Sequence, residues 1–153
     1  MNNDDLRLMK NAIKLAKGCN PLQEAIPKVG AVIAIGGKVI ASGRRGNGGP
    51  GANEHAEWNA LAEVKDKTRL TKATLYATLE PCTGEVRTRP LESCTELIHQ
   101  HRIKRVVIGM LDPNQGVTGK GLWRLQDAGV DVSLFPHDLA QKVRALNAAF
   151  IRF

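Results

Sequence analysis

Three separate segments of this chain carry residues that can bind a metal ion, and this feature limits the possible folds more than any other. His55 and Glu57 stand two positions apart, Cys82 follows a proline, and Cys94 comes after the longer stretch 83–93. Imidazole and thiolate are preferred ligands of Zn²⁺, and a tetrahedral ion with three protein ligands keeps its fourth position for water. We therefore predict that His55, Cys82 and Cys94 bind a catalytic zinc ion, which requires the fold to bring these segments to one point.

Glu57 has a different predicted role, because it need not be a ligand. We expect it to take a proton from zinc-bound water and to pass it to a leaving group, as in hydrolytic deamination. Two other interpretations are two buried structural cysteines beside an unrelated histidine, and a zinc-stabilised binding module without catalysis. The elements follow one another in the order expected of a zinc site: a helix that begins at His-x-Glu, a strand, Pro-Cys, and a second helix that begins at a cysteine. This order argues against unrelated structural cysteines. The presence of Glu57 argues against the second, because a purely structural zinc site does not need it.

Apolar periodicity predicts an alternation of helices and strands. A first helix capped by Asp4 or Asp5 ends at Gly18, and the pair Gly36-Gly37 joins two β-branched strands into a hairpin. Strands are predicted over 29–35, 38–42, 73–79, 104–110 and 130–135, and further helices over 55–64, from 94, around 122–128 and over 139–150. A hairpin followed by strand–helix units predicts an α/β domain with a five-stranded mixed sheet, covered by helices on both faces.

Several stretches around these residues resemble a known family. The His-x-Glu, Pro-Cys and Cys elements look like those of the zinc-dependent cytidine/deoxycytidylate deaminase superfamily. Within it, the chain is most similar to the riboflavin-biosynthesis pyrimidine deaminase domain, the diaminohydroxyphosphoribosylaminopyrimidine deaminase. The similar stretches are TLYATLEPC (74–82), RT (87–88), DPN (112–114), GKGL (119–122) and AGVDV (128–132). The resemblance implies a three-layer α/β/α cytidine-deaminase-like fold, with residues 1–153 as a single zinc-dependent deaminase domain and Zn²⁺ as its cofactor.

The resemblance also implies which side chains contact the substrate. The Gly-rich loop 43–53 leads to the first zinc ligand and is expected to form a wall of the active site, with Asn53 as a substrate contact. Arg87 and Thr88 match the Arg-Thr of the riboflavin-type enzymes, and an arginine fork suits a phosphate. Asp112 and Asn114 belong to the segment after the strand 104–110, which lines the substrate pocket in this superfamily, so they are expected to contact the ring or the ribose. Forming a turn is the alternative role of these two residues.

The predicted reaction is hydrolytic removal of an exocyclic amine from a pyrimidine. The resemblance implies the phosphoribosylaminopyrimidine of riboflavin biosynthesis, or a related small molecule, as the substrate. The net charge of +7 and the pI near 9.6 favour an anionic partner, either a phosphorylated small molecule or nucleic acid. The alternatives are a cytosine or adenine deaminase of single-stranded DNA or tRNA, and a deaminase of a free nucleoside, nucleotide or base. Aromatic residues make up only 4% of the chain, which argues against stacking on single strands.

Length and composition indicate the number of domains and the cellular compartment. The 153 residues suffice for one domain. No apolar run approaches the roughly 20 residues that span a bilayer, and the acidic, polar start does not look like a secretory signal, so a cytoplasmic protein is predicted. Bacterial relatives usually carry a reductase domain after the deaminase, so a chain ending at Phe153 is expected to be a stand-alone deaminase or a relative with another substrate. The resemblance further implies a homodimer or homotetramer.

Overall fold

The computed structural model describes residues 1–20, 26–46, 55–84 and 92–152. Most of these residues lie in short helices and strands that alternate along the chain, as the periodicity predicted. In chain order they are α1 (Asn3–Lys17), β1 (Gly30–Ile35), β2 (Lys38–Arg44), α2 (Ala56–Glu63), the 3₁₀ helix η1 (Lys67–Lys72), β3 (Thr74–Leu79), α3 (Cys94–Gln100), β4 (Arg105–Met110), α4 (Lys120–Asp127), β5 (Asp131–Leu134), α5 (His137–Leu146) and α6 (Ala148–Ile151).

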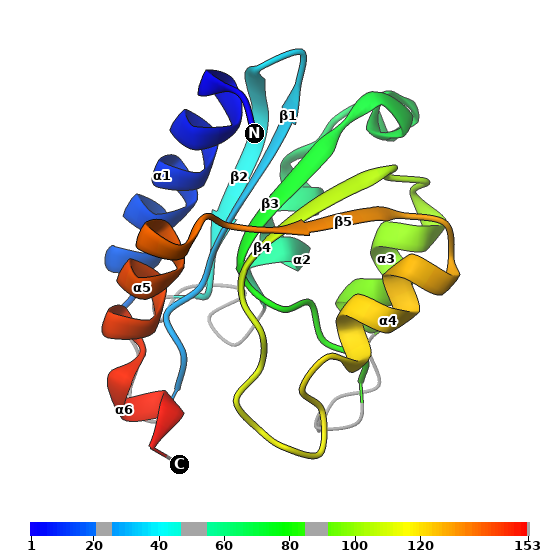
Figure 1. The fold of residues 1–153 in the computed structure, drawn as a ribbon. Coiled ribbons are helices and arrows are strands. Elements are labelled where there is room, and N and C mark those ends of the chain that lie inside the picture. Colours follow the sequence, from blue (N-terminus) through cyan, green and yellow to red (C-terminus); the bar gives the residue numbers. More distant parts are fainter. Residues whose placement is uncertain (21–25, 47–54, 85–91, 153) are drawn as a thin grey trace.

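The five strands form one mixed sheet in the order β2-β1-β3-β4-β5 (Figure 1). Strand β1 is antiparallel to both β2 and β3, whereas β3, β4 and β5 run parallel. Parallel neighbours need a crossover, and α3 and α4 supply the two crossovers. The predicted five-stranded mixed sheet is confirmed. Because β3 and β4 are parallel neighbours, the segments that leave their carboxyl ends start at the same edge of the sheet.

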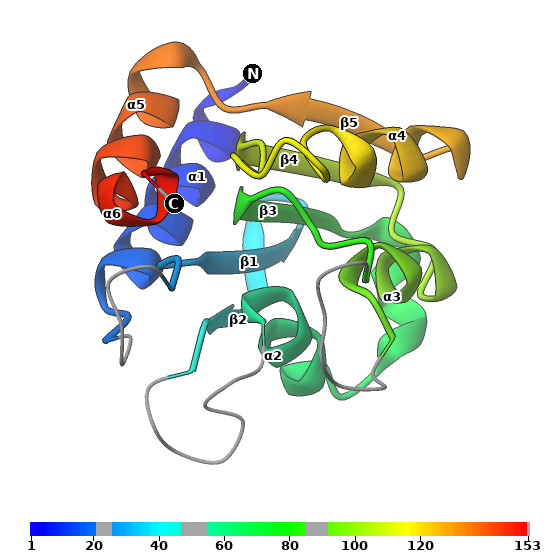
Figure 2. The same ribbon diagram turned by 90° about the horizontal axis from the view of Figure 1, so that it is seen from below.

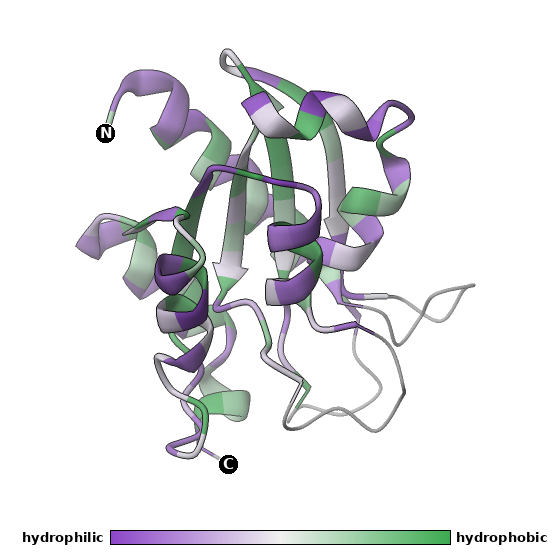
Figure 3. Cartoon of the chain, turned by 90° about the vertical axis from the view of Figure 1, so that its right-hand side faces the viewer, coloured by the Kyte–Doolittle hydropathy of each residue, from purple (hydrophilic) through white to green (hydrophobic). Residues whose placement is uncertain are grey.

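Helices cover both faces of this sheet, so the molecule has three layers. Helices α1, α5 and α6 lie on one face, and α2, α3 and α4 lie on the other (Figures 1 and 2). The central strands β1, β3 and β4 are buried along nearly their whole length, as expected for strands covered on both sides. Hydrophilic and hydrophobic residues are interspersed along the helices (Figure 3), and in α1 the buried apolar residues Leu8, Met9, Ala12, Ile13 and Ala16 recur at helical spacing. The predicted three-layer α/β/α architecture is confirmed.

The hairpin between β1 and β2 has the predicted two-residue loop. Gly36 and Gly37 have φ angles of +56° and +80°. A two-residue loop that needs positive φ at both positions matches the twist of the strands, and glycine adopts these angles without steric cost. The predicted strand over 38–42 extends two residues further, to Arg44.

The structure differs from the sequence prediction at both terminal helices. Asn2, not Asp4 or Asp5, caps α1, and its side chain accepts from the Asp5 N–H while Asp5 accepts from the Asn2 N–H in return. The helix predicted over 139–150 is divided at Asn147. The Asn147 side-chain oxygen accepts from the Lys28 N–H at 2.7 Å, and its amide donates to the carbonyls of Lys28 and Val143. The buried Asn147 side chain thus binds the backbone of Lys28 at the point where α5 ends.

Helix α2 lies directly on the edge strand β2 because Gly43 has no side chain. A Cβ at Gly43 would come within 2.5 Å of the Ala60 nitrogen and 2.6 Å of the Ala56 oxygen. The amide of Asn59 also donates to the Arg44 carbonyl at 2.9 Å. This close approach holds the amino-terminal end of α2 beside the strands, where the predicted ligand His55 lies.

A buried ionic network ties α1 to the amino ends of β3 and β4. Both carboxylate oxygens of Asp5 accept from the Arg105 guanidinium, at 2.8 and 3.1 Å, and the Tyr76 hydroxyl donates to Asp5 at 2.5 Å. The Arg105 hydrogen bonds hold the pKa of Asp5 well below its usual range, and burial raises the pKa of Tyr76 to about 12. Asp5 is therefore ionised and fully paired at neutral pH.

Replacing Asp5 with asparagine is expected to lower the free energy of unfolding at pH 7 by about 2 kcal/mol, because the charge-assisted hydrogen bonds are lost. Since the pKa of Asp5 is depressed in the folded state, its contribution is present above about pH 4 and is lost as the pH falls further. Urea unfolding of both proteins from pH 7 to pH 3 should show the difference shrinking below pH 4. Asp4→Asn is the matched control, because Asp4 pairs with Arg7 at the surface; a constant difference for Asp5→Asn would contradict the assignment.

Candidate active site

The site begins at the amino-terminal end of α2. His55 is the N-cap residue of this helix and has extended backbone angles, so it lies just before the helix and not within its first turn as predicted. Glu57 lies in the first turn and is only 3% exposed. A carboxylate is favoured at this helix end by the partial positive charge of the unpaired N–H groups.

The two cysteines come from the segment after β3 and from the start of α3. Cys82 follows Pro81 beyond the carboxyl end of β3, and Cys94 is the first residue of α3, as predicted. The Cys94 N–H donates to the Cys82 sulfur at 3.3 Å, and the Thr95 N–H donates to the Cys82 carbonyl at 3.1 Å. Ser93 caps α3 by accepting from the Glu96 N–H. These contacts hold the two sulfur atoms together.

The candidate ligand atoms of His55, Cys82 and Cys94 all lie within 4.8 Å of one another. The Cys94 sulfur lies 3.4 Å from Nδ1 of His55 and 3.6 Å from Oε2 of Glu57. Two sulfur atoms and one imidazole nitrogen suit a tetrahedral Zn²⁺ with one position left for water, and a carboxylate stands beside that set. The donor set therefore fits zinc.

The electrostatics of the cluster agree with a cation site. Hydrogen bonding from Cys94, together with the neighbouring His55, lowers the pKa of the Cys82 thiol to about 3. Burial raises the pKa of Glu57, and the charge of His55 offsets part of this effect. A buried thiolate beside a carboxyl group is stabilised by nearby positive charge, which a divalent ion supplies.

Arg45 is a residue near the site that the sequence reasoning missed. Burial lowers the pKa of its guanidinium, while the charges of Glu57, Cys19, Cys82 and Cys94 act in the opposite direction. In the sequence it was only one of two arginines in a Gly-rich stretch. In the structure, β2 continues to Arg44, whose carbonyl accepts from Asn59 of α2, so Arg45 follows directly beside this helix.

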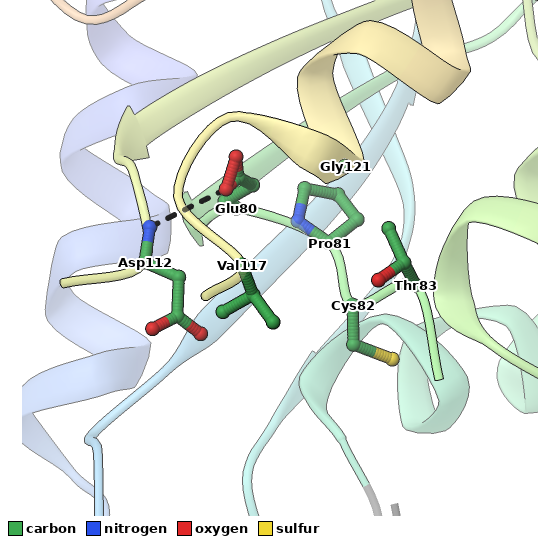
Figure 4. Close-up of a pocket in the computed structure, with 7 residues that line it drawn as sticks. All are labelled: Glu80, Pro81, Cys82, Thr83, Asp112, Val117 and Gly121. Carbon is green, nitrogen blue, oxygen red and sulfur yellow. Dashed lines mark hydrogen bonds between the residues drawn. The ribbon is translucent and has the colours of Figure 1, made fainter. Parts of the chain in front are cut away.

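The structure separates the two predicted residues after β4. Asp112 lines a small pocket together with Cys82, and the close-up shows both residues at its rim (Figure 4). Asn114 is exposed, and its side chain accepts from the Gly116 N–H at 3.0 Å, as in a turn. The predicted substrate contacts Asn53, Arg87 and Thr88 lie outside the described residues.

A three-layer fold with a His–Cys–Cys cluster and a buried glutamate defines the class of zinc-dependent hydrolases that deaminate. The family model of the cytidine and deoxycytidylate deaminase zinc-binding region matches residues 2–110. The chain belongs to this family, and the resemblance and the zinc cofactor inferred from the sequence are both confirmed.

Named relatives place the chain more closely within that family. It is 38% identical over 126 residues to the diaminohydroxyphosphoribosylamino-pyrimidine deaminase of Buchnera aphidicola, covering 82% of this chain and 80% of the relative. It is 39% identical over 149 residues to the riboflavin biosynthesis protein RibD of Aquifex aeolicus, covering 97% of this chain and 39% of the relative. The RibD structure from Acinetobacter baumannii (form 2) superposes with a TM-score of 0.82 at 32% identity, over 97% of this chain and 39% of that one. The chain thus spans about 39% of the length of such RibD relatives.

The part of the chain that the structure describes contains no helix that is both long and apolar enough to cross a membrane.

Proposed function

We propose that residues 1–153 form a single deaminase domain that hydrolytically removes an exocyclic amine from the phosphoribosylaminopyrimidine of riboflavin biosynthesis. The cluster of His55, Cys82 and Cys94 beside the buried Glu57 is the observation that carries the proposal. The names of the relatives from Buchnera and Aquifex support this substrate.

The proposed roles follow from the geometry of the cluster. His55, Cys82 and Cys94 would hold Zn²⁺, which when bound lowers the pKa of a water ligand from about 15.7 towards 7. Glu57 accepts the proton that this water loses, because its Oε2 lies beside the ligand set. Glu57 would then return this proton to the exocyclic nitrogen, so that the nitrogen can leave as ammonia while the oxygen of the water takes its place on the ring carbon.

Positive charge beside the cluster supports an anionic substrate, and the guanidinium of Arg45 supplies it on the side of β2. Asp112, which lines the pocket with Cys82, instead supplies hydrogen-bond acceptors suited to the ring or the ribose. We assign substrate contacts to Asp112 and, as proposals from the resemblance, to Asn53, Arg87, Thr88 and Asn114. Self-association as a dimer or tetramer and a cytoplasmic location are also part of the proposal.

The test is ammonia release by the zinc-loaded protein across a substrate panel. The panel contains the phosphoribosylaminopyrimidine, cytidine, deoxycytidylate, cytosine, guanine and single-stranded oligonucleotides. We expect turnover of the phosphoribosylaminopyrimidine and much slower turnover of the others. Turnover of oligonucleotides or of an unphosphorylated base instead would overturn the substrate but not the zinc chemistry.

A further inference from the structure

The carboxylate of Glu80 links the strand that leads to Cys82 with the segment that follows β4. Glu80 is 5% exposed, and its own N–H donates to the Met110 carbonyl at 2.8 Å. Its side chain accepts from the Gly119 N–H, at 2.7 and 3.1 Å to the two oxygens. It also accepts from the Asp112 N–H at 3.4 Å, the contact drawn as a dashed line in Figure 4. One buried carboxylate thus binds both ends of the segment 112–119.

This carboxylate also serves as the missing cap of α4. The N-cap residue of α4 is Gly119, which has no side chain and makes no side-chain cap hydrogen bond. Glu80, the residue after β3, instead reaches the Gly119 N–H, and hydrogen bonding from the backbone of Leu122 acts on the same carboxylate. A negative charge at the start of a helix is favoured by the exposed N–H groups there.

The residues before Cys82 and the start of α4 are in such close contact that neither can move without the other. A Cβ at Gly121 would come within 2.2 Å of the Pro81 carbonyl oxygen, so α4 begins directly against the residue before Cys82. Within the segment, the Thr118 hydroxyl lies 2.5 Å from the Asp112 carbonyl and 2.8 Å from that of Asn114. A displacement of α4 or of the segment 112–119 would therefore shift Asp112.

We propose that Glu80 is a positioning residue that fixes Asp112 relative to the zinc ligand Cys82, and so sets the shape of the substrate pocket. Glu80 acts through the backbone of the segment 112–119 and does not itself touch the reacting atoms. The inference rests on the proposed function for its kinetic consequence, but the link between Glu80 and the segment can be tested without any substrate.

The substrate-free test is amide hydrogen exchange in Glu80→Gln, which keeps the shape of the side chain but replaces one acceptor oxygen with a donor. We expect exchange at Gly119 and Asp112 to become about tenfold faster or more, because both lose a charge-assisted hydrogen bond. Zinc content is expected to be unchanged. Unaltered exchange at both amides would overturn the proposal, whichever substrate the protein uses.

The kinetic test separates positioning from a general loss of stability. Glu80→Gln is expected to raise KM about tenfold with a smaller change in kcat, because the pocket is misshapen while the zinc ligands and Glu57 stay in place. Val143→Ala, at a buried residue of α5 on the opposite face of the sheet from α4, is the control for a comparable loss of Tm, and it should leave KM unchanged. Equal KM values for the two variants would show that Glu80 has only a structural role. Absence of turnover by the wild-type protein would count against the proposed function alone.

Discussion

Replacing Glu57 with glutamine is expected to abolish deamination while leaving the zinc content unchanged. Glutamine has the same shape but cannot accept and return a proton. General acid–base catalysis is worth about 10²–10⁴ in rate, and Glu57 is used for two proton transfers, so the loss should lie near the upper end. Ammonia release and elemental analysis on the same sample measure both quantities.

Glu63→Gln is the matched control for this variant. Glu63 is the last residue of the same helix and is exposed, so the change removes the same charge from α2 without altering the site. It should keep full activity. If Glu57→Gln also retained activity, Glu57 would have no part in the proton transfers and another group would have to supply them.

Replacing Cys94 with serine is expected to remove the zinc ion and, with it, both activity and part of the stability. A serine hydroxyl remains protonated at neutral pH and is a poor zinc ligand, whereas the cysteine ligates as a thiolate. Because Cys94 is fully buried and lies between His55 and Cys82, its loss leaves the other ligands without a complete set. Elemental analysis should find much less than one zinc per chain, and Tm should fall.

Two comparisons make the Cys94 experiment decisive. Cys19→Ser makes the same chemical change at a buried cysteine outside the ligand set, where the thiol donates to the Val29 carbonyl, and it should keep its zinc. A chelator should lower the Tm of the wild-type protein but leave that of Cys94→Ser unchanged. A Cys94→Ser protein that held one zinc per chain would contradict the ligand assignment.

The fold and the ligand cluster could be predicted because their signals are local. Apolar, β-branched runs marked the strands, Gly36-Gly37 marked the hairpin, and the later Pro-Cys and Cys elements gave meaning to a His-x-Glu pair that is weak evidence by itself. The division of the last helix was missed because Asn147, at the point of division, exchanges a pair of hydrogen bonds with Lys28, which lies far away in the sequence.

The parts of the site that sequence could not provide also depend on distant contacts. Arg45 lies where it feels the charges of the cluster because it follows β2, whose Gly43 packs against α2, and Glu80 gains its role only when Gly119 and Asp112 are brought to it. A glutamate before a proline and an arginine in a Gly-rich stretch have no distinctive local pattern. Their roles emerge from the strand order and not from their neighbours in the chain.

The network of Asp5, Tyr76 and Arg105 lies at the amino ends of β3 and β4, whereas Cys82 and Asp112 follow their carboxyl ends. The length of the strands therefore separates the network that we expect to set acid stability from the residues of the proposed active site. For an engineer, the two ends of these strands offer separate places at which to alter acid stability and substrate preference.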